Sequence, residues 1–172
     1  NFWFNAAEPS DDFVGMLETD PRYDDPRTIY VDKSAPDGGA GTLASPFNLI
    51  RNALNVNAAG QPLPVANPNA VDPDRGGDIL RIVSNTGTDG DIRTEIDNLA
   101  YEIGFNSLGS VLEDGAIFEV PRDVTVMVDA GSIFKMRRSW IAAGSVSASP
   151  LRDHSAGVFQ VLGTPVFVDQ LG

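Results

Sequence analysis

Several aspartates are spaced in loops in a way that suggests metal binding. They stand in the runs DPDRGGD and TDGD, and the candidate metal ligands are Asp72, Asp74, Asp78, Asp89 and Asp91. Carboxylate oxygens suit Ca²⁺, and an EF-hand loop places them at alternate positions before a glycine and a later glutamate. DPDRGGD departs from that pattern after Asp74. Solvated Asx turns are the simpler interpretation, and a structural Ca²⁺ is the only cofactor that the sequence suggests.

Nucleophilic and acid–base catalysis find little support in the residue types. The chain has no cysteine, so disulfides, thiolate metal sites and cysteine nucleophiles are excluded. Its one histidine, His154, stands between Asp153 and Ser155. Three consecutive side chains do not converge on one point as a catalytic triad must. We therefore expect His154 to be a loop residue.

Exposed aromatic residues are a further route to function, because they can stack on sugar rings or fill a seam between subunits. Phe2, Trp3 and Phe4 open the chain, and Trp140 stands alone. A chain terminus that carries such an aromatic cluster is usually packed against the rest of the protein. We therefore assign Phe2, Trp3 and Phe4, together with the apolar pair Phe167 and Val168 near the other end, to a cap or an inter-subunit seam.

The composition of the chain indicates which classes of protein and which partners are compatible with it. The 172 residues are 42% hydrophobic, enough for one folded core rather than disorder. A formal net charge of -12 argues against nucleic acid and anionic membranes as partners, and leaves divalent-cation bridging open. No run approaches the ~20 apolar residues of a membrane helix. The chain opens with Asn1 and no apolar leader, so we expect a removed signal peptide or a fragment.

Three segments differ in character along the chain. Residues 1–28 form an acidic, proline-containing lead-in. Residues 29–76 hold a short strand, a Gly/Asp/Pro loop, a capping helix around residues 48–55 and a proline-rich loop. The apolar residues of that helix are Phe47, Ile50, Ala53 and Leu54. From residue 77 to residue 172, short apolar runs bounded by Gly, Pro and Asp predict strands.

The predicted strands recur at short intervals, with a loop-like, Ser/Ala/Gly-rich excursion over residues 137–155. They are Ile29–Val31, Ile79–Val83, Leu99–Ile103, Ala116–Val120, Val124–Val128, Ser132–Lys135, Val158–Leu162 and Val166–Val168. Val124, Val126 and Val128 share one face by alternation. Gly131 suits a tight corner between strands.

Short strands at this spacing fit a sandwich, a barrel or a parallel solenoid. Tight two-residue hairpin turns are scarce, which favours the solenoid. Solenoids need polar terminal caps, and the last strands run to Gly172 without one. We therefore expect that the chain continues or that a partner subunit covers this end.

Four segments together resemble the right-handed parallel β-helix proteins of the pectin-lyase-like superfamily. They are GTLASPFNLIRNAL (41–54), GDILRIV (77–83), VPRDVTVMVDAGSIFKMRRSWIAAGS (120–145) and VFQVLGTPVFV (158–168). In particular they resemble the N-terminal part of large secreted β-helix surface proteins of planctomycete type. The resemblance implies an all-β solenoid with an N-terminal capping helix, as a fragment or a module of few coils.

The same resemblance implies two functions. The first is a non-enzymatic, extracellular or cell-surface structural or adhesive module, which assembles with itself into a layer, fibre or filament and contacts surface polysaccharide. The second is part of a polysaccharide lyase or hydrolase whose groove lies beyond residue 172. A lyase needs acidic Ca²⁺ ligands and a basic residue on one face. The candidates for that arrangement are Asp123, Asp129, Lys135, Arg137 and Arg138. No lyase motif accompanies them, so the structural function is the preferred one.

Overall fold

The fold is all-β, with almost no helix. The computed structural model describes residues 27–84, 99–144 and 153–163. Its strands are β1 (Thr28–Val31), β2 (Ile79–Ile82), β3 (Tyr101–Gly104), β4 (Phe118–Glu119), β5 (Thr125–Val128), β6 (Phe134–Arg137), β7 (Ile141–Ala142) and β8 (Val158–Val161). The one helix described, α2 (Ile50–Ala53), is a single turn.

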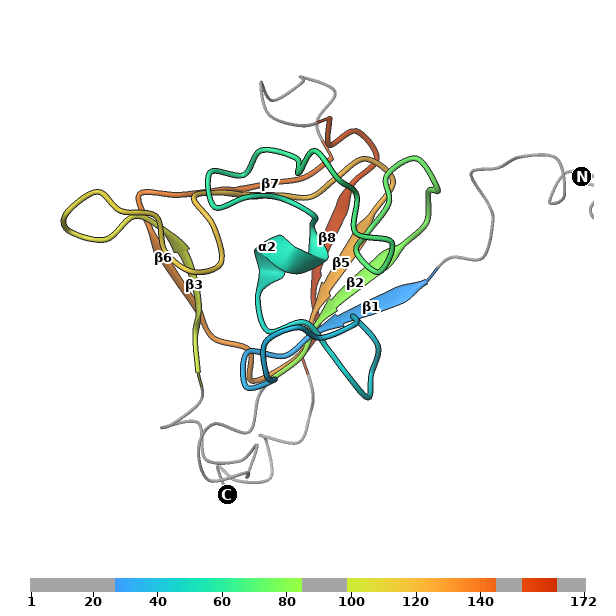
Figure 1. Ribbon diagram of the computed structural model, residues 1–172, viewed down its shortest axis with the longest axis horizontal. Helices are drawn as coiled ribbons and strands as arrows, with labels where there is room; N and C mark the ends of the chain where they lie inside the picture. Colours follow the sequence, from blue (N-terminus) through green and yellow to red (C-terminus); the bar gives the residue numbers. More distant parts are fainter. Residues whose placement is uncertain (1–26, 85–98, 145–152, 164–172) are drawn as a thin grey trace, which may run out of the picture.

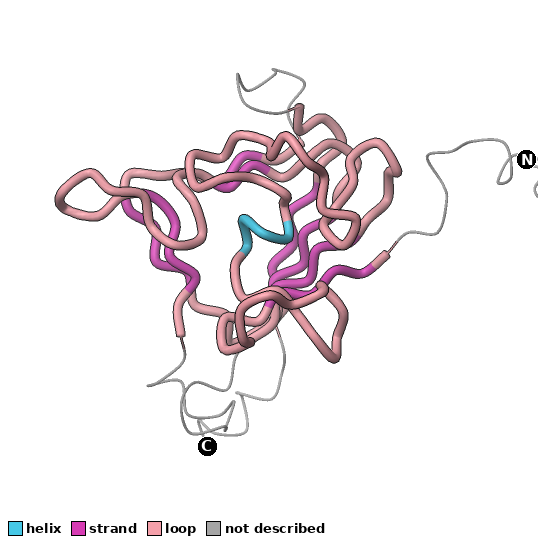
Figure 2. Tube along the Cα trace, viewed as in Figure 1, coloured by secondary structure: helices cyan, strands magenta, loops and turns pink. Residues whose placement is uncertain are grey.

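The strands form three parallel sheets that the chain visits in turn. One sheet has the order β1-β2-β5-β8, and the other two pair β3 with β6 and β4 with β7. After β2 the chain passes to β3 and β4, returns to the first sheet at β5, and repeats the circuit through β6 and β7 to β8. Figures 1 and 2 show the three sheets arranged around α2.

The register places apolar side chains in ladders that run across the sheets into one core. Two ladders cross the first sheet: Ile29, Leu80, Val126 and Phe159, and Val31, Ile82, Val128 and Val161. The members on β1, β2 and β5 are all buried, as are the inward residues Tyr101, Ile103 and Phe118 of the other sheets. The predicted common face of Val124, Val126 and Val128 is confirmed. Each buried aliphatic side chain stabilises the fold by about 1.5–3 kcal/mol.

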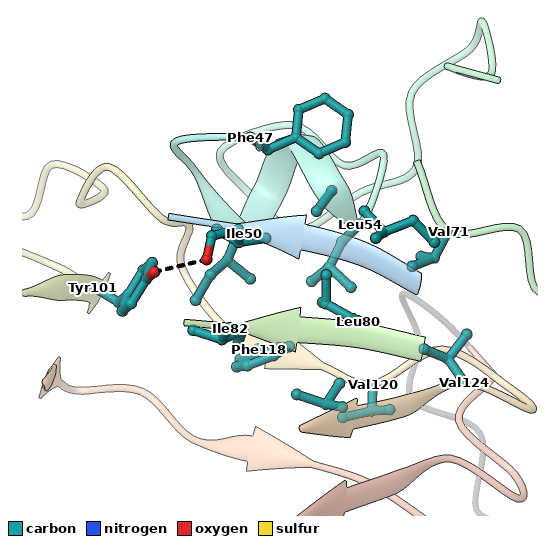
Figure 3. Packing of buried hydrophobic residues seen from close by; sticks show 14 of the residues in the cluster. Phe47, Ile50, Leu54, Val71, Leu80, Ile82, Tyr101, Phe118, Val120 and Val124 are labelled. Carbon is teal, nitrogen blue, oxygen red and sulfur yellow. Dashed lines mark hydrogen bonds between the residues drawn. The ribbon is translucent and has the colours of Figure 1, made fainter. Parts of the chain in front are cut away.

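One end of this core is covered by α2 and its flanking residues. Phe47, Ile50, Ala53 and Leu54 are all buried, as the predicted amphipathic helix requires. The helix is shorter than the predicted span around residues 48–55 because Asn55 turns the chain into the left-handed region at φ 56°. Figure 3 shows α2 above β1, with β2 and β5 following below.

Backbone groups at the helix end of the sheets are also bonded. Tyr30 of β1 donates its N–H to the Gly41 carbonyl at 2.8 Å and accepts from the Phe47 N–H at 3.0 Å. On β3, the Glu102 carbonyl accepts from the Asp114 N–H at 3.0 Å, and the Asp114 carboxylate accepts from the Glu102 N–H at 2.8 Å. We call this the closed end: α2 together with the bonded outer edges of β1 and β3.

The structure corrects four strand predictions, and the predicted strand Val166–Val168 lies outside the described residues. The predicted strand Ala116–Val120 is reduced to the two residues of β4. β6 begins two residues later than predicted and takes in Arg137, because its register with β3 sets its bounds. β3 is displaced in the same direction. β7 falls within the predicted loop-like excursion, since two residues are too few to show an alternating pattern. The corner at Gly131 is confirmed, with φ at 84°.

Tyr101 links three parts of the core through its hydroxyl group. The hydroxyl oxygen accepts from the Lys33 N–H at 3.1 Å. Its single hydrogen is shared between the carbonyl oxygens of Val31 and Val83, which lie 3.0 Å and 2.9 Å from the hydroxyl oxygen. Figure 3 shows one of these bonds as a dashed line from the Tyr101 hydroxyl group. Burial, and secondarily the charge of Asp32, raises the pKa of Tyr101 well above its usual value.

The substitution Tyr101→Phe should lower the free energy of unfolding by about 1–3 kcal/mol, because it leaves buried backbone groups without their partner. The raised pKa predicts a pH effect as well. An unfolded tyrosine loses its proton near pH ~10 while the folded one keeps it, so the stability from this group is present below that pH and lost above it. Denaturant unfolding from pH 7 to pH ~11 should show a steeper alkaline loss in the parent than in the variant. Tyr30→Phe, on the outward face of β1, is the control, and an equal slope in parent and Tyr101→Phe would contradict the assignment.

Candidate functional site

Among the described residues, the strand edges at the end away from α2 have no neighbouring strand. Val158 and Leu162 donate their N–H groups to the Val124 and Val128 carbonyls of the neighbouring chain segment at 2.9 and 2.8 Å. In a parallel pair alternate residues bond to each side, so the backbone groups of Phe159 and Val161 point away from the sheet. Among the described residues, β6 and β7 are likewise the last strands of their sheets. We call β6, β7 and β8 together the open end.

Side chains that continue the buried ladders are exposed at the open end. Val161 is 74% exposed, although Val128, one strand below it, is 4% exposed. Met136 is 39% exposed, against 0% for Ile103 beside it on β3. The ladders therefore reach this end without the cover that α2 provides at the other.

Aromatic rings hold the last strands onto the core. The rings of Phe159 and Phe118 meet edge to face with centroids 5.8 Å apart, and those of Phe134 and Tyr101 lie tilted at 5.5 Å. Phe134, Ile141 and Phe159 are only partly buried against the core. The open end is thus an ordered apolar surface, since its strands are anchored from below.

Positive charge gathers along β6. Lys135, Arg137 and Arg138 are exposed, and none forms an ion pair within the described residues. Arg138 donates to the Asn106 carbonyl at 2.8 Å, and Trp140 beyond it is 56% exposed. In a chain with formal net charge -12, this cluster gives one rim of the open end the opposite sign.

The acidic loop DPDRGGD is organised by an ion pair rather than by converging carboxylates. Asp78 is fully buried and accepts from the Arg27 Nη2 at 2.8 Å, from the Arg27 backbone N–H at 3.1 Å and from the Asp72 N–H at 3.0 Å. Asp72 accepts from the Asp74 N–H at 3.0 Å, which is Asx-turn geometry. In the part of the chain described, no three or more His, Cys, Asp or Glu side chains are grouped to hold a metal ion. Asp89 and Asp91 lie outside the described residues, and the Ca²⁺ hypothesis stays a prediction.

A hollow of about 680 Å³ lies beside this loop. Its charged lining residues are Arg27, Arg75, Arg122, Asp72, Asp74 and Asp153. Hydrogen bonds from the Ser155 backbone N–H and then from its side chain lower the pKa of Asp153. Cations and carboxylates balance in number here, and Arg27 is already bonded to Asp78 and to the Pro68 and Ala70 carbonyls. The charged side chains that line the hollow therefore sum to no formal net charge.

Asp114 is a second buried carboxylate that stabilises the fold through its hydrogen bonds, and the sequence analysis did not predict this role. Its oxygens accept from the Lys33 Nζ at 2.7 Å, the Ile50 N–H at 3.0 Å and the Glu102 N–H at 2.8 Å. It thus joins β1, α2 and β3 at the closed end. An Asp-Gly pair indicates a turn, but no sequence pattern indicates partners about 12, 64 and 81 residues away.

The candidate lyase residues are not assembled into one site. Asp123 and Asp129 flank β5 at opposite ends, and Asp129 is paired with the Arg81 Nε at 3.0 Å. Lys135 and Arg137 lie on β6, in another sheet. His154 lies in a loop, as predicted, but is buried, and its Nδ1 has no hydrogen-bond partner among the described residues.

The predicted seam residues Phe2, Trp3, Phe4, Phe167 and Val168 lie outside the described ranges. None of the helices in those ranges is long and apolar enough to span a membrane.

Searches against protein-family models, curated proteins and solved structures found no match to the chain.

The substitution Asp78→Asn should destabilise the fold by about 3 kcal/mol, because it leaves the partly buried Arg27 guanidinium without its counter-charge and puts an amide where backbone N–H groups need an acceptor. Chemical denaturation measures the loss. Asp74→Asn is the matched control in the same loop, since the Asp74 side chain is 92% exposed. Equal stability of the two variants would show that the Arg27–Asp78 pair does not organise the loop.

Proposed function

We propose that the chain is a non-enzymatic structural or adhesive module of a secreted protein, and that it assembles with itself at the cell surface. One observation carries the proposal: the open end carries unpaired strand edges and exposed ladder residues, while the closed end is covered. Such an edge is a template for pairing with further strands.

We further propose that the three sheets are the faces of a right-handed parallel β-helix, with α2 capping its first coil. The repeated circuit through the sheets and the purely parallel pairing support this architecture. Parallel strands joined by a crossover are nearly always connected in the right-handed sense. In such a solenoid each coil buries its apolar face only against its neighbours, so an exposed last coil favours association.

Contact with an anionic surface polysaccharide is a second candidate function, and the β6 rim favours it. Lys135, Arg137 and Arg138 form no ion pair among the described residues, and the exposed Trp140 ring supplies a flat surface for a sugar. This contact would make the module adhesive as well as structural. Binding to a polyuronate column that weakens in Arg137→Glu, but not in Arg75→Glu, would support it.

The substitution Val161→Lys should weaken self-association about tenfold or more, because joining the open ends would bury an unpaired ammonium group. The fold itself should change by no more than about 0.5 kcal/mol, since the residue replaced is already exposed. Light scattering over a concentration series measures the mass. The control is Val158→Lys, on the same strand but on its outward face. A parent that stays monomeric at every concentration would contradict the proposed function.

A further inference from the structure

The difference between the two ends limits how copies can join through the strands. At the closed end, the outer edge groups of β1 and β3 already bond to the segment around Gly41 to Phe47 and to Asp114. An open end that added to a closed end would have to break those bonds. If the proposed function holds, joining by strand edges therefore brings two open ends together.

We infer that two copies of the chain pair about a two-fold axis through β8, with the two β8 strands antiparallel. The edge groups that point away from the sheet belong to Phe159 and Val161. In an antiparallel ladder, two residues that both offer an N–H and a carbonyl form a hydrogen-bonded pair. Phe159 of one copy thus stands opposite Val161 of the other, and Gln160 stands opposite Gln160.

This register also keeps the side chains on the correct faces. Phe159 and Val161 both continue the inward ladders, at the positions of Val126 and Val128. A shift by one residue would set an inward side chain against an outward one. The register with Phe159 opposite itself satisfies the faces but pairs Val161 with Gly157, outside the strand. Only the first register uses both free residues of β8 and covers Val161.

The charges on the two strands favour a two-fold axis through β8 over one through β6. The four residues of β8 are uncharged. A two-fold axis through β6 would set Lys135 and Arg137 of one copy against those of the other, and like charges directly opposite each other destabilise a strand pair. An axis through β8 instead exchanges the other two sheets, so that β6 faces the uncharged β7 (Figure 1).

A pair of this kind is closed. Both open ends are used in one isologous interface, so no edge remains for a third copy and the strands cannot propagate a fibre. Each copy has a formal net charge of -12, so added salt should strengthen the pair by screening their mutual repulsion.

The chain has no cysteine, which allows a direct test of the register with Gln160→Cys. In the inferred pair the two residues at 160 form a non-hydrogen-bonded pair with Cα atoms about 4.5 Å apart, within the range of a disulfide. Val158→Cys is the matched control on the same outward face. Its two copies would lie about 13 Å apart along the strands, too far for a disulfide.

Non-reducing electrophoresis after mild oxidation with glutathione disulfide measures disulfide-linked dimers of the two variants. In parallel, light scattering measures the mass of the parent at about 50 and 500 mM salt. A linked dimer from Gln160→Cys but not from Val158→Cys, and a parent mass that levels off at two copies, support the inference. Equal linking of both variants overturns the register. If the parent forms assemblies of more than two copies and Val161→Lys abolishes them, the closed pair is wrong, while the proposed function stands. A monomer under all conditions overturns both.

Discussion

The structure depends on one constraint: apolar ladders in parallel sheets are buried only where another layer lies above and below. Leu80 and Val126 are fully buried because β1 and β8 flank their strands. Val161 follows the same inward pattern and is mostly exposed, because no described strand follows β8. The same residue type on the same face therefore differs in exposure only by its place in the stack.

Two buried aspartates hold the first strands and the segments around them in place. Asp78 and Asp114 each accept backbone N–H groups and each pairs with one cation, Arg27 and Lys33 respectively. Strand edges without a neighbouring strand need such acceptors, because a buried, unpaired N–H costs about 1–3 kcal/mol. Asp114 thus does for β3 what another strand does for the later strands.

Charge is distributed in a way that suits joining at one end. The molecule as a whole is acidic, while the cations of β6, which form no ion pair among the described residues, lie on the rim of the open end. In the proposed pairing, general repulsion between copies would keep their other faces apart, and the uncharged β8 strand would leave one surface where contact carries no local penalty. Under that proposal, the closed end governs stability and the open end governs association.

The sequence by itself determined the class of the fold and much of the inward pattern. Alternation fixed the common face of Val124, Val126 and Val128, and the amphipathic spacing of Phe47, Ile50 and Ala53 placed the capping residues. These are local properties, because side-chain direction follows from the backbone period alone. Only the tertiary structure decided the register of β6, the existence of β7 and the tasks of Asp78 and Asp114. Each of these depends on partners about 20 to 80 residues away, and no local pattern records which distant strand will lie alongside.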